Sequence, residues 1–303
     1  MTIERAAVKA VRKPWGSADL RPWSQSAEGG PPVGELWFER ADPAAPEPAL
    51  LLKLLFTEQP LSIQVHPDDA FARSIGLPNG KTEAWYVVVA GVGAQIALGL
   101  KRVITSAELR TAIEDGSIAE LVQWRDVVPN EAILVPAGTI HAIGAGLVIA
   151  EIQQRSDATF RMFDYERHRE LHIDNAVGVA FTGPAAAQIA PVELSPGRQV
   201  LATSDYFVLE QIELPANSSW EVDMEGEAWL LVLAGDASLE AEHAAIGEAL
   251  FIDAQLATCR AGQAGLKCLV AYVATQPFAG LFRRLHDEPA FADRLPSIEE
   301  LPT

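Results

Sequence analysis

The chain is poor in cysteine and in basic residues. Its two cysteines, Cys259 and Cys268, form no Cys-x-x-Cys pair. They therefore predict neither a disulfide framework nor a redox motif, and we expect two reduced structural thiols. Lys and Arg number 23 against 41 Asp and Glu, so the formal net charge is −18. This charge argues against nucleic acid and anionic membranes as partners, although a few local cations can still hold a small anionic substrate.

Long apolar runs are also lacking. The first residues carry no apolar segment of the length that a secretory signal needs. No stretch approaches the ~18 apolar residues of a membrane-spanning helix. We therefore expect a cytoplasmic protein, and the sequence leaves its oligomeric state open.

Short strands separated by Gly, Pro, Asn and Asp dominate the pattern. The predicted strands are 50–55, 61–65, 84–90, 93–98, 132–135, 147–152, 207–214, 228–234 and 266–273. Many short strands with regular turns are typical of sandwiches and barrels. The run 229–233 is continuously apolar, which indicates a strand covered on both faces. We predict a mainly β fold of the sandwich or barrel type.

Helical signals are few and lie in the N-terminal half. Residues 105–108 (TSAE) form a capping box ahead of Leu109, and residues 117–120 (SIAE) repeat the pattern. Together they predict a small helical insertion at about 105–125. Proline and two acids at 67–69 predict another short helix, which ends near Gly76.

The two halves of the chain share an internal repeat. Residues 83–91 (EAWYVVVAG) match 227–235 (EAWLLVLAG) without a gap, and 131–135 (EAILV) resemble 248–252 (EALFI). An Ala- and Pro-rich stretch separates them. We predict a catalytic barrel at 1–183 that contains the helical insertion, a linker at 184–197, and at 198–303 a degenerate second barrel with a C-terminal tail.

Four side chains of the first half could form a metal site. Gln64 and His66 are two residues apart, so on a strand they share a face. Glu83 begins the next strand, and His141 follows a Pro-Ala-Gly turn. Two nitrogens and two oxygens suit a divalent cation such as zinc. A lone histidine is more often a core or surface residue, so the joint pattern carries the prediction.

Counting equal numbers of residues from the matched segments assigns a second-half counterpart to each predicted ligand. These counterparts indicate which barrel contains the metal site. Val208 falls opposite Gln64, Glu210 opposite His66 and Thr258 opposite His141. Only Glu227 of the second half then repeats a ligand type, so we expect no metal there. His168, His172, His243 and His286 have no comparable setting; His168 and His172 could be helical neighbours, but we interpret them as a solvated face.

Further polar groups follow His141. Residues 151–161 include Glu151 and Arg161, which suit acid–base catalysis and stabilisation of an anion. The alternative is a surface salt-bridge cluster at a strand end. Lys53 lies in an apolar strand. It either faces inward, which requires an anionic partner, or faces outward with its ammonium in solvent.

These motifs together resemble a known family. They are residues 12–16 (RKPWG), 34–37 (GELW), 61–69 (LSIQVHPDD), 80–86 (GKTEAWY), 136–142 (PAGTIHA) and 151–157 (EIQQRSD), followed by Arg161 and residues 164–165 (DY) and 171–173 (LHI). In this order they resemble the type I mannose-6-phosphate isomerases, zinc enzymes built on cupin barrels. The resemblance implies a mainly β fold of two cupin-like β-barrels of the jelly-roll type, with the small helical insertion in the N-terminal half. The resemblance covers about the first 180 residues, and the chain length is similar to the short bacterial form.

The resemblance implies an activity and a set of residues for it. One zinc ion would be held by Gln64, His66, Glu83 and His141. Mannose 6-phosphate and fructose 6-phosphate would interconvert through an enediol(ate). The resemblance implies that Arg161 is catalytic and that Lys81 and Glu151 line the pocket. Glu151, Lys81 and a zinc-bound water stay open as the general base. For the phosphate we expect Lys53, Lys81, Arg161 and Ser62.

Two other functions stay open at this point. One is a sugar-binding cupin without catalysis, which would be expected to erode the ligand set or Arg161. The other is a different metal-dependent cupin enzyme, such as an iron oxygenase. The oxygens of Gln64 and Glu83 make a harder site than the histidine-rich sites of such oxygenases. Isomerase turnover before and after chelation separates these functions.

Overall fold

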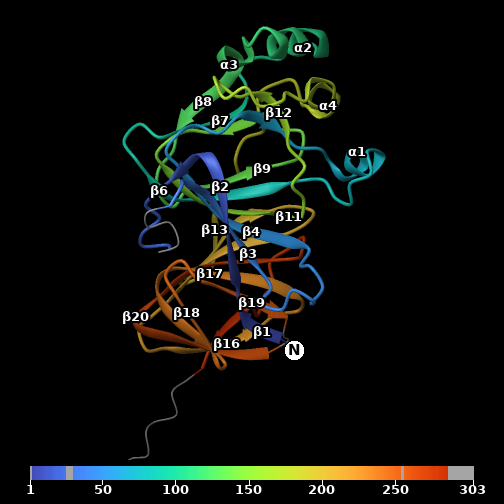
Figure 1. The fold of residues 1–303 in the computed structure, drawn as a ribbon. Helices are drawn as coiled ribbons and strands as arrows, with labels where there is room; N and C mark the ends of the chain where they lie inside the picture. Colours follow the sequence, from blue (N-terminus) through green and yellow to red (C-terminus); the bar gives the residue numbers. More distant parts are fainter. Residues whose placement is uncertain (1, 25–29, 254–255, 286–303) are drawn as a thin grey trace, which may run out of the picture.

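A computed structural model describes residues 2–24, 30–253 and 256–285. Two β-barrels are stacked, the first drawn in blue to green and the second in orange to red, with helices at the far end of the first (Figure 1). This confirms the predicted mainly β fold with a small helical insertion. In the described part of the chain, no helix has the length and apolar character needed to cross a membrane.

Two antiparallel sheets form the first barrel. The larger has the order β2 (Ala7–Ser17), β3 (Val33–Glu39), β4 (Leu50–Thr57), β11 (Leu147–Gln154), β6 (Glu83–Ala90) and β9 (Ala132–Val135). The smaller has the order β12 (Phe160–Phe163), β5 (Ile63–Val65), β10 (His141–Ile143), β7 (Gln95–Leu100) and β8 (Val122–Asp126). Side chains such as Trp85 and Ile149 fill the space between these sheets.

A single sheet curls to form the second barrel. Its main path is β1 (Thr2–Arg5), β19 (Ala249–Asp253), β17 (Glu227–Leu239), β20 (Leu256–Tyr272), β15 (Val208–Leu214), β14 (Arg198–Thr203) and β13 (Val192–Ser195). Three further strands lie outside this order: β16 (Ser219–Asp223) pairs with β20, β18 (Glu242–Ala245) pairs with β17, and β21 (Phe282–Arg284) pairs with β16. Cys259 and Cys268 are free and buried inside this barrel, as expected for structural thiols.

Four helices lie in the described N-terminal half: α1 (Asp69–Ser74), α2 (Ser106–Glu114), α3 (Ile118–Leu121) and α4 (Ile173–Val179). The capping box of α2 is confirmed, because Thr105 and Glu108 exchange side-chain-to-backbone hydrogen bonds of 3.1 and 2.8 Å. The second predicted capping box is wrong. Ser117 has helical backbone angles and its hydroxyl caps nothing. Helix α1 begins as predicted, with the Asp68 carboxylate accepting from Phe71 N at 2.8 Å.

The two barrels share one apolar core. Leu52 and Leu54 of β4 pack in the same cluster as Trp229 and Leu231 of β17. Leu230, which alternates with them, faces the interior of the second barrel. The prediction that 229–233 is covered on both faces is therefore confirmed, and the first barrel supplies one cover.

The gapless sequence alignment of the repeat differs by one residue from the structural equivalence of the two barrels. Trp85 lies inside the first barrel, but its sequence match Trp229 lies in the core between the barrels. Because successive strand residues face opposite sides, a shift of one residue reverses the direction of every side chain. Glu83 points into its barrel, whereas Glu227 accepts hydrogen bonds from Ala49 and Leu50 of the other barrel.

The predicted counterparts of the ligands change accordingly. Glu210 pairs with Val270 across the β15–β20 ladder. At the equivalent position of the first barrel, Lys53 pairs with Glu151 across the β4–β11 ladder. Glu210 is therefore the counterpart of Lys53 and not of His66, and Val208 on the same strand does not correspond to Gln64. Thr258 alternates with Cys259, whose side chain faces the interior. Counting failed because α1 lengthens the connection between β5 and β6.

Two strands cross the predicted domain boundaries. β1, from the first residues, pairs with β19 of the second barrel, and β13 lies within the predicted linker and pairs with β14. We propose that 1–183 and 198–285 are the two structural units, with β1 exchanged onto the second. Residues 286–303 of the predicted tail, including His286, lie outside the described residues.

We predict that a fragment of residues 1–183 aggregates. Truncation would expose the face that carries Leu52 and Leu54 and would leave β1 without β19. Exposed apolar patches of this kind promote association. Size-exclusion chromatography and dye binding, with the full chain as control, measure the effect. A soluble, monomeric and fully active fragment would contradict the prediction.

Candidate metal centre

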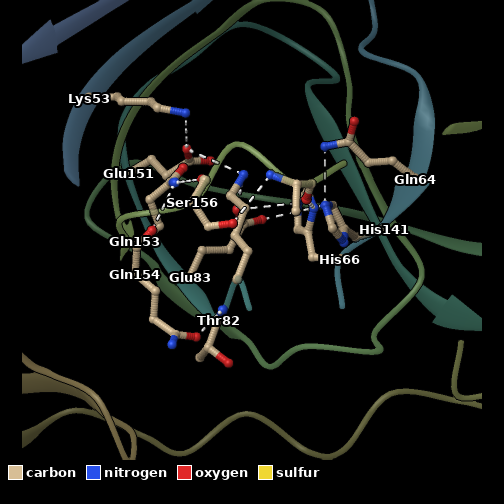
Figure 2. Close-up of polar contacts among 12 residues, drawn as sticks. Lys53, Gln64, His66, Thr82, Glu83, His141, Glu151, Gln153, Gln154 and Ser156 are labelled. Atoms are coloured by element: carbon tan, nitrogen blue, oxygen red, sulfur yellow. Dashed lines mark hydrogen bonds and ion pairs between the residues drawn. The ribbon is translucent and has the colours of Figure 1, made fainter. Parts of the chain in front are cut away.

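Neighbouring strands bring the predicted ligands together. His141 of β10 lies directly opposite Gln64 of β5 in the smaller sheet. Glu83 starts β6 in the larger sheet and faces them across the barrel interior. Figure 2 shows the two imidazoles and the Glu83 carboxylate converging, with the Gln64 amide beside His141. His66, Glu83 and His141 present ligand atoms within 4.8 Å of one another.

Backbone carbonyls orient both imidazoles. His66 Nδ1 donates to Ala158 O at 2.8 Å, and His141 Nδ1 donates to Thr139 O at 2.8 Å. Each bond leaves the Nε2 lone pair directed at Glu83, whose oxygens lie 3.5 Å from His66 Nε2 and 3.4 Å from His141 Nε2. A carbonyl that accepts from the other ring nitrogen is the usual arrangement around a metal-binding histidine.

The centre contains buried polar atoms without hydrogen bonds. His66 Nε2 and Glu83 Oε1 have no hydrogen-bond partner, and Glu83 Oε2 has only its ion pair with Lys81. All three ligand side chains are at most 1% exposed. Unsatisfied buried groups are costly and call for an explanation. Three converging electron-pair donors fit a cation, so the residues present suit the metal that the sequence predicted.

Gln64 is the least buried of the four predicted ligands. Its Nε2 lies 3.3 Å from His141 Nε2, and its Oε1 accepts from Ser62 Oγ at 3.1 Å. Rotating the amide by a half-turn would place Oε1 beside His141 Nε2. That orientation offers a fourth donor to a cation.

Burial keeps the histidines neutral. Burial, with help from the Lys81 charge, lowers the pKa of His66 to about 3. Burial also lowers the pKa of His141. Burial alone would raise the pKa of Glu83, but Lys81 and the two imidazoles hold it well below its usual range. Two neutral imidazoles and a carboxylate are the protonation states that bind a divalent metal.

A line of alternating charges leads away from the centre. Lys81 Nζ lies 2.8 Å from Glu83 and 3.9 Å from Glu151. Lys53 Nζ lies 3.4 Å from Glu151 and 3.9 Å from Glu35. The inward alternative for Lys53 is therefore confirmed, and its ammonium also lies 4.6 Å from the centre of the Trp37 ring. The outward alternative is wrong.

The pKa values of Glu151 and Lys81 are both raised, for different reasons. Burial raises the pKa of Glu151, although Lys81 and Lys53 oppose it. Burial alone would lower the pKa of Lys81, but Glu151 and Glu83 raise it above its usual value. Glu151 is fixed by Trp85, whose Nε1 donates to Oε2 at 3.2 Å. The surface-cluster alternative is therefore wrong for Glu151, which is 4% exposed.

Arg161 lies next to the centre. It pairs with Gln64 across the β12–β5 ladder, and directly opposite residues share a face of the sheet. Its Nη1 donates to Glu170 O at 2.8 Å, while its buried Nε has no partner. Burial and two neighbouring guanidiniums, Arg169 and Arg167, lower its pKa. Arg167 and Arg169 themselves pair with Asp164, at 2.9 and 2.6 Å.

His168 and His172 are not neighbours on one helix. His168 is exposed, as predicted for a solvated face. His172 precedes α4 and is half-buried, and its Nδ1 accepts from Arg161 N at 3.0 Å. It therefore helps to hold β12 in place, which corrects the prediction for this residue.

Sequence reasoning missed three groups that support the centre. Glu35 was visible within the GELW motif but had no role there. The carbonyls of Ala158 and Thr139 left no sequence signal, because any residue supplies a carbonyl. Only the fold brings them to the imidazoles.

Parts of the chain are similar in sequence to proteins named mannose-6-phosphate isomerase. No family model matches the chain. It is 42% identical over 137 residues to mannose-6-phosphate isomerase ManA of Bacillus subtilis, a match that spans 43% of each chain. It is 37% identical over 192 residues to mannose-6-phosphate isomerase of Streptococcus mutans, spanning 59% of this chain and 60% of that protein. The matches thus span about half the length of these relatives.

Solved structures extend the likeness to most of the chain. The crystal structure of the mannose 6-phosphate isomerase from Bacillus subtilis superimposes with a TM-score of 0.78 at 25% identity, covering 90% of this chain and 100% of that one. A phosphomannose isomerase of Salmonella typhimurium shares the fold at 18% identity, with a TM-score of 0.70 over 90% of this chain. The chain is therefore similar in sequence to mannose-6-phosphate isomerases over about half of its length, and it shares the fold of a solved mannose 6-phosphate isomerase over most of it.

Proposed function

We propose that the protein interconverts mannose 6-phosphate and fructose 6-phosphate with one zinc ion. The observation that carries this proposal is the set of unsatisfied ligand atoms on His66 and Glu83, beside His141 and next to Lys81 and Glu151. The relatives named mannose-6-phosphate isomerase support the substrate pair. A sugar-binding protein without catalysis would need neither the ligand atoms nor the buried charge line.

Gln64, His66, Glu83 and His141 would hold the zinc ion. One carboxylate, two imidazoles and an amide oxygen form a donor set that zinc accepts. When bound, zinc supplies a Lewis acid that polarises the substrate oxygens at C1 and C2. The buried walls keep water from competing for this interaction.

We assign the proton transfer to Glu151 of β11 and to Lys81, which lies just before β6. The reaction removes a proton from C2 and returns one to C1, so it needs an acceptor that can also donate. Glu151 carries a carboxylate whose pKa burial raises toward neutrality, which suits this role. Lys81 lies between two carboxylates that stabilise its ammonium form, so we propose that it donates to substrate oxygen.

Arg161 and its neighbours would meet the negative charge. The Arg161 guanidinium would stabilise the charge that develops on the substrate oxygens or hold the phosphate. The Lys53 side chain is 4% exposed and is held by carboxylates, so its charge acts on the Glu151 carboxylate. Ser62, bonded to Gln64, remains a proposed substrate contact.

Zinc content tests the ligand set. We expect one zinc per chain, and we expect His141→Ala to lose it because the remaining donors are too few for tight binding. His243→Ala, at an exposed histidine of the second barrel, is the matched control and should keep its zinc. Elemental analysis and an anomalous diffraction peak measure this. A peak at His172, or zinc within residues 192–285, would refute the assignment.

Arg161→Ala tests the role of the guanidinium. We expect turnover to fall about 10²- to 10³-fold, the usual cost of losing one donor to developing negative charge, with zinc content unchanged. Arg283→Ala, at an exposed arginine paired with Glu221, is the control. Steady-state kinetics and metal analysis are compared on the same samples. Equal loss of zinc and activity would show that Arg161 is structural.

Glu151→Gln tests the base. The amide keeps an acceptor for Trp85 Nε1 but cannot take a proton. We expect turnover to fall about 10²- to 10⁴-fold, the range that general base catalysis contributes. Lys81→Gln in the same assay should keep more activity than Glu151→Gln. The reverse order would make Lys81 the base.

A further inference from the structure

The last two residues of β11 and the polar segment that follows them support the candidate centre directly. Its Ala158 carbonyl holds the His66 imidazole, and its Ser156 carbonyl accepts from the buried Gln153 amide at 2.5 Å. On one side, residues 79–82 hold it: Ser156 Oγ donates to Asn79 O at 3.0 Å, and Thr82 N donates to Gln154 Oε1 at 2.9 Å. We call residues 153–158 the support loop.

On its other side the support loop rests on the chain that leads into β4. Arg155 N donates to Ala49 O at 2.8 Å, and Arg155 Nε donates to Pro48 O at 2.7 Å. The carbonyls of residues 48–49 are thus occupied by the support loop. The position of these two carbonyls therefore depends on the contacts that residues 48–49 make on the side away from the support loop.

Glu227 of the second barrel holds that opposite side. Its Oε1 accepts from Ala49 N at 2.6 Å and from Leu50 N at 3.3 Å. Two residues along β17, Trp229 Nε1 donates to Leu50 O at 3.2 Å. Hydrogen bonds from amides to a carboxylate are stronger than those to a neutral acceptor. The segment 48–50 is therefore a bridge, held by Glu227 and holding Arg155.

We propose that Glu227 is a positioning residue of the active site, acting from the second barrel through the bridge on the support loop. This inference rests on the proposed isomerase function for its kinetic consequence. The one-residue register shift described above turns this carboxylate out of its own barrel and toward the first. The second barrel then contributes the placement of Ala158, and hence of His66, without touching substrate.

Glu227→Ala, Glu227→Gln and Glu225→Ala test the proposal in the full-length protein. Glutamine keeps an oxygen that can accept from Ala49 N, so it should rescue. Glu225 is an exposed carboxylate two residues earlier and is the matched control. The first readout is hydrogen exchange of the peptide 153–159, which needs no substrate. We expect about tenfold faster exchange in Glu227→Ala and near wild-type exchange in the other two.

The second readout is kinetic. With zinc loaded, we expect kcat of Glu227→Ala to fall about tenfold while KM changes less than about twofold, because small misplacements of catalytic groups affect the reacting geometry most. Glu227→Gln should recover most of the loss. Unchanged exchange in Glu227→Ala, or faster exchange with wild-type kcat, would overturn the proposal. Absence of isomerase turnover in the wild type would refute the proposed function, and the exchange comparison would still decide whether Glu227 holds the support loop.

Discussion

Burial of the larger sheet of the first barrel on both faces is the constraint on which the rest depends. One face of β4, β11 and β6 packs in the apolar core between the barrels, through residues such as Leu54, Ile152 and Tyr86. The other face lines the barrel interior and carries Lys53, Glu151 and Glu83. Without the second barrel the first face would lie in water, and the strands that carry the charged groups would lose their support.

Charges inside the first barrel are tolerated because they alternate. Each buried ammonium lies between two carboxylates, so no charge is left unpaired at large cost. The line ends at Glu83, where Glu83 Oε1 and the nearby His66 Nε2 have no hydrogen-bond partner. The second barrel has a similar buried pair, Arg198 with Glu210, but its groups are engaged: the guanidinium donates to Glu210 and to the carbonyls of Phe278 and Ala279, and Glu210 also accepts from the Tyr272 hydroxyl. It stabilises the barrel and offers nothing to a ligand.

The second barrel therefore serves the centre through contacts at its outer face. Trp229 supplies apolar cover and a hydrogen bond to Leu50, and Glu227 accepts from the amides at the start of β4. Tyr86 of the first barrel adds a hydrogen bond of 2.7 Å to Gln211 of the second. These bonds fix the sheet that carries the charged line relative to its partner. Through these contacts the second barrel can contribute to the order of the site in the first barrel.

Local sequence rules determined the strands, the α2 capping box and the shared face of Gln64 and His66, because each depends on residues a few positions apart. The motifs then indicated the resemblance to the type I mannose-6-phosphate isomerases, and proteins of that name are similar to the chain. Only the tertiary structure decided the direction of Lys53, the carbonyls that orient His66 and His141, and the outward direction of Glu227. The reason is that these depend on strand register between distant segments, and a slip of one residue, which the sequence repeat conceals, reverses the face of every side chain.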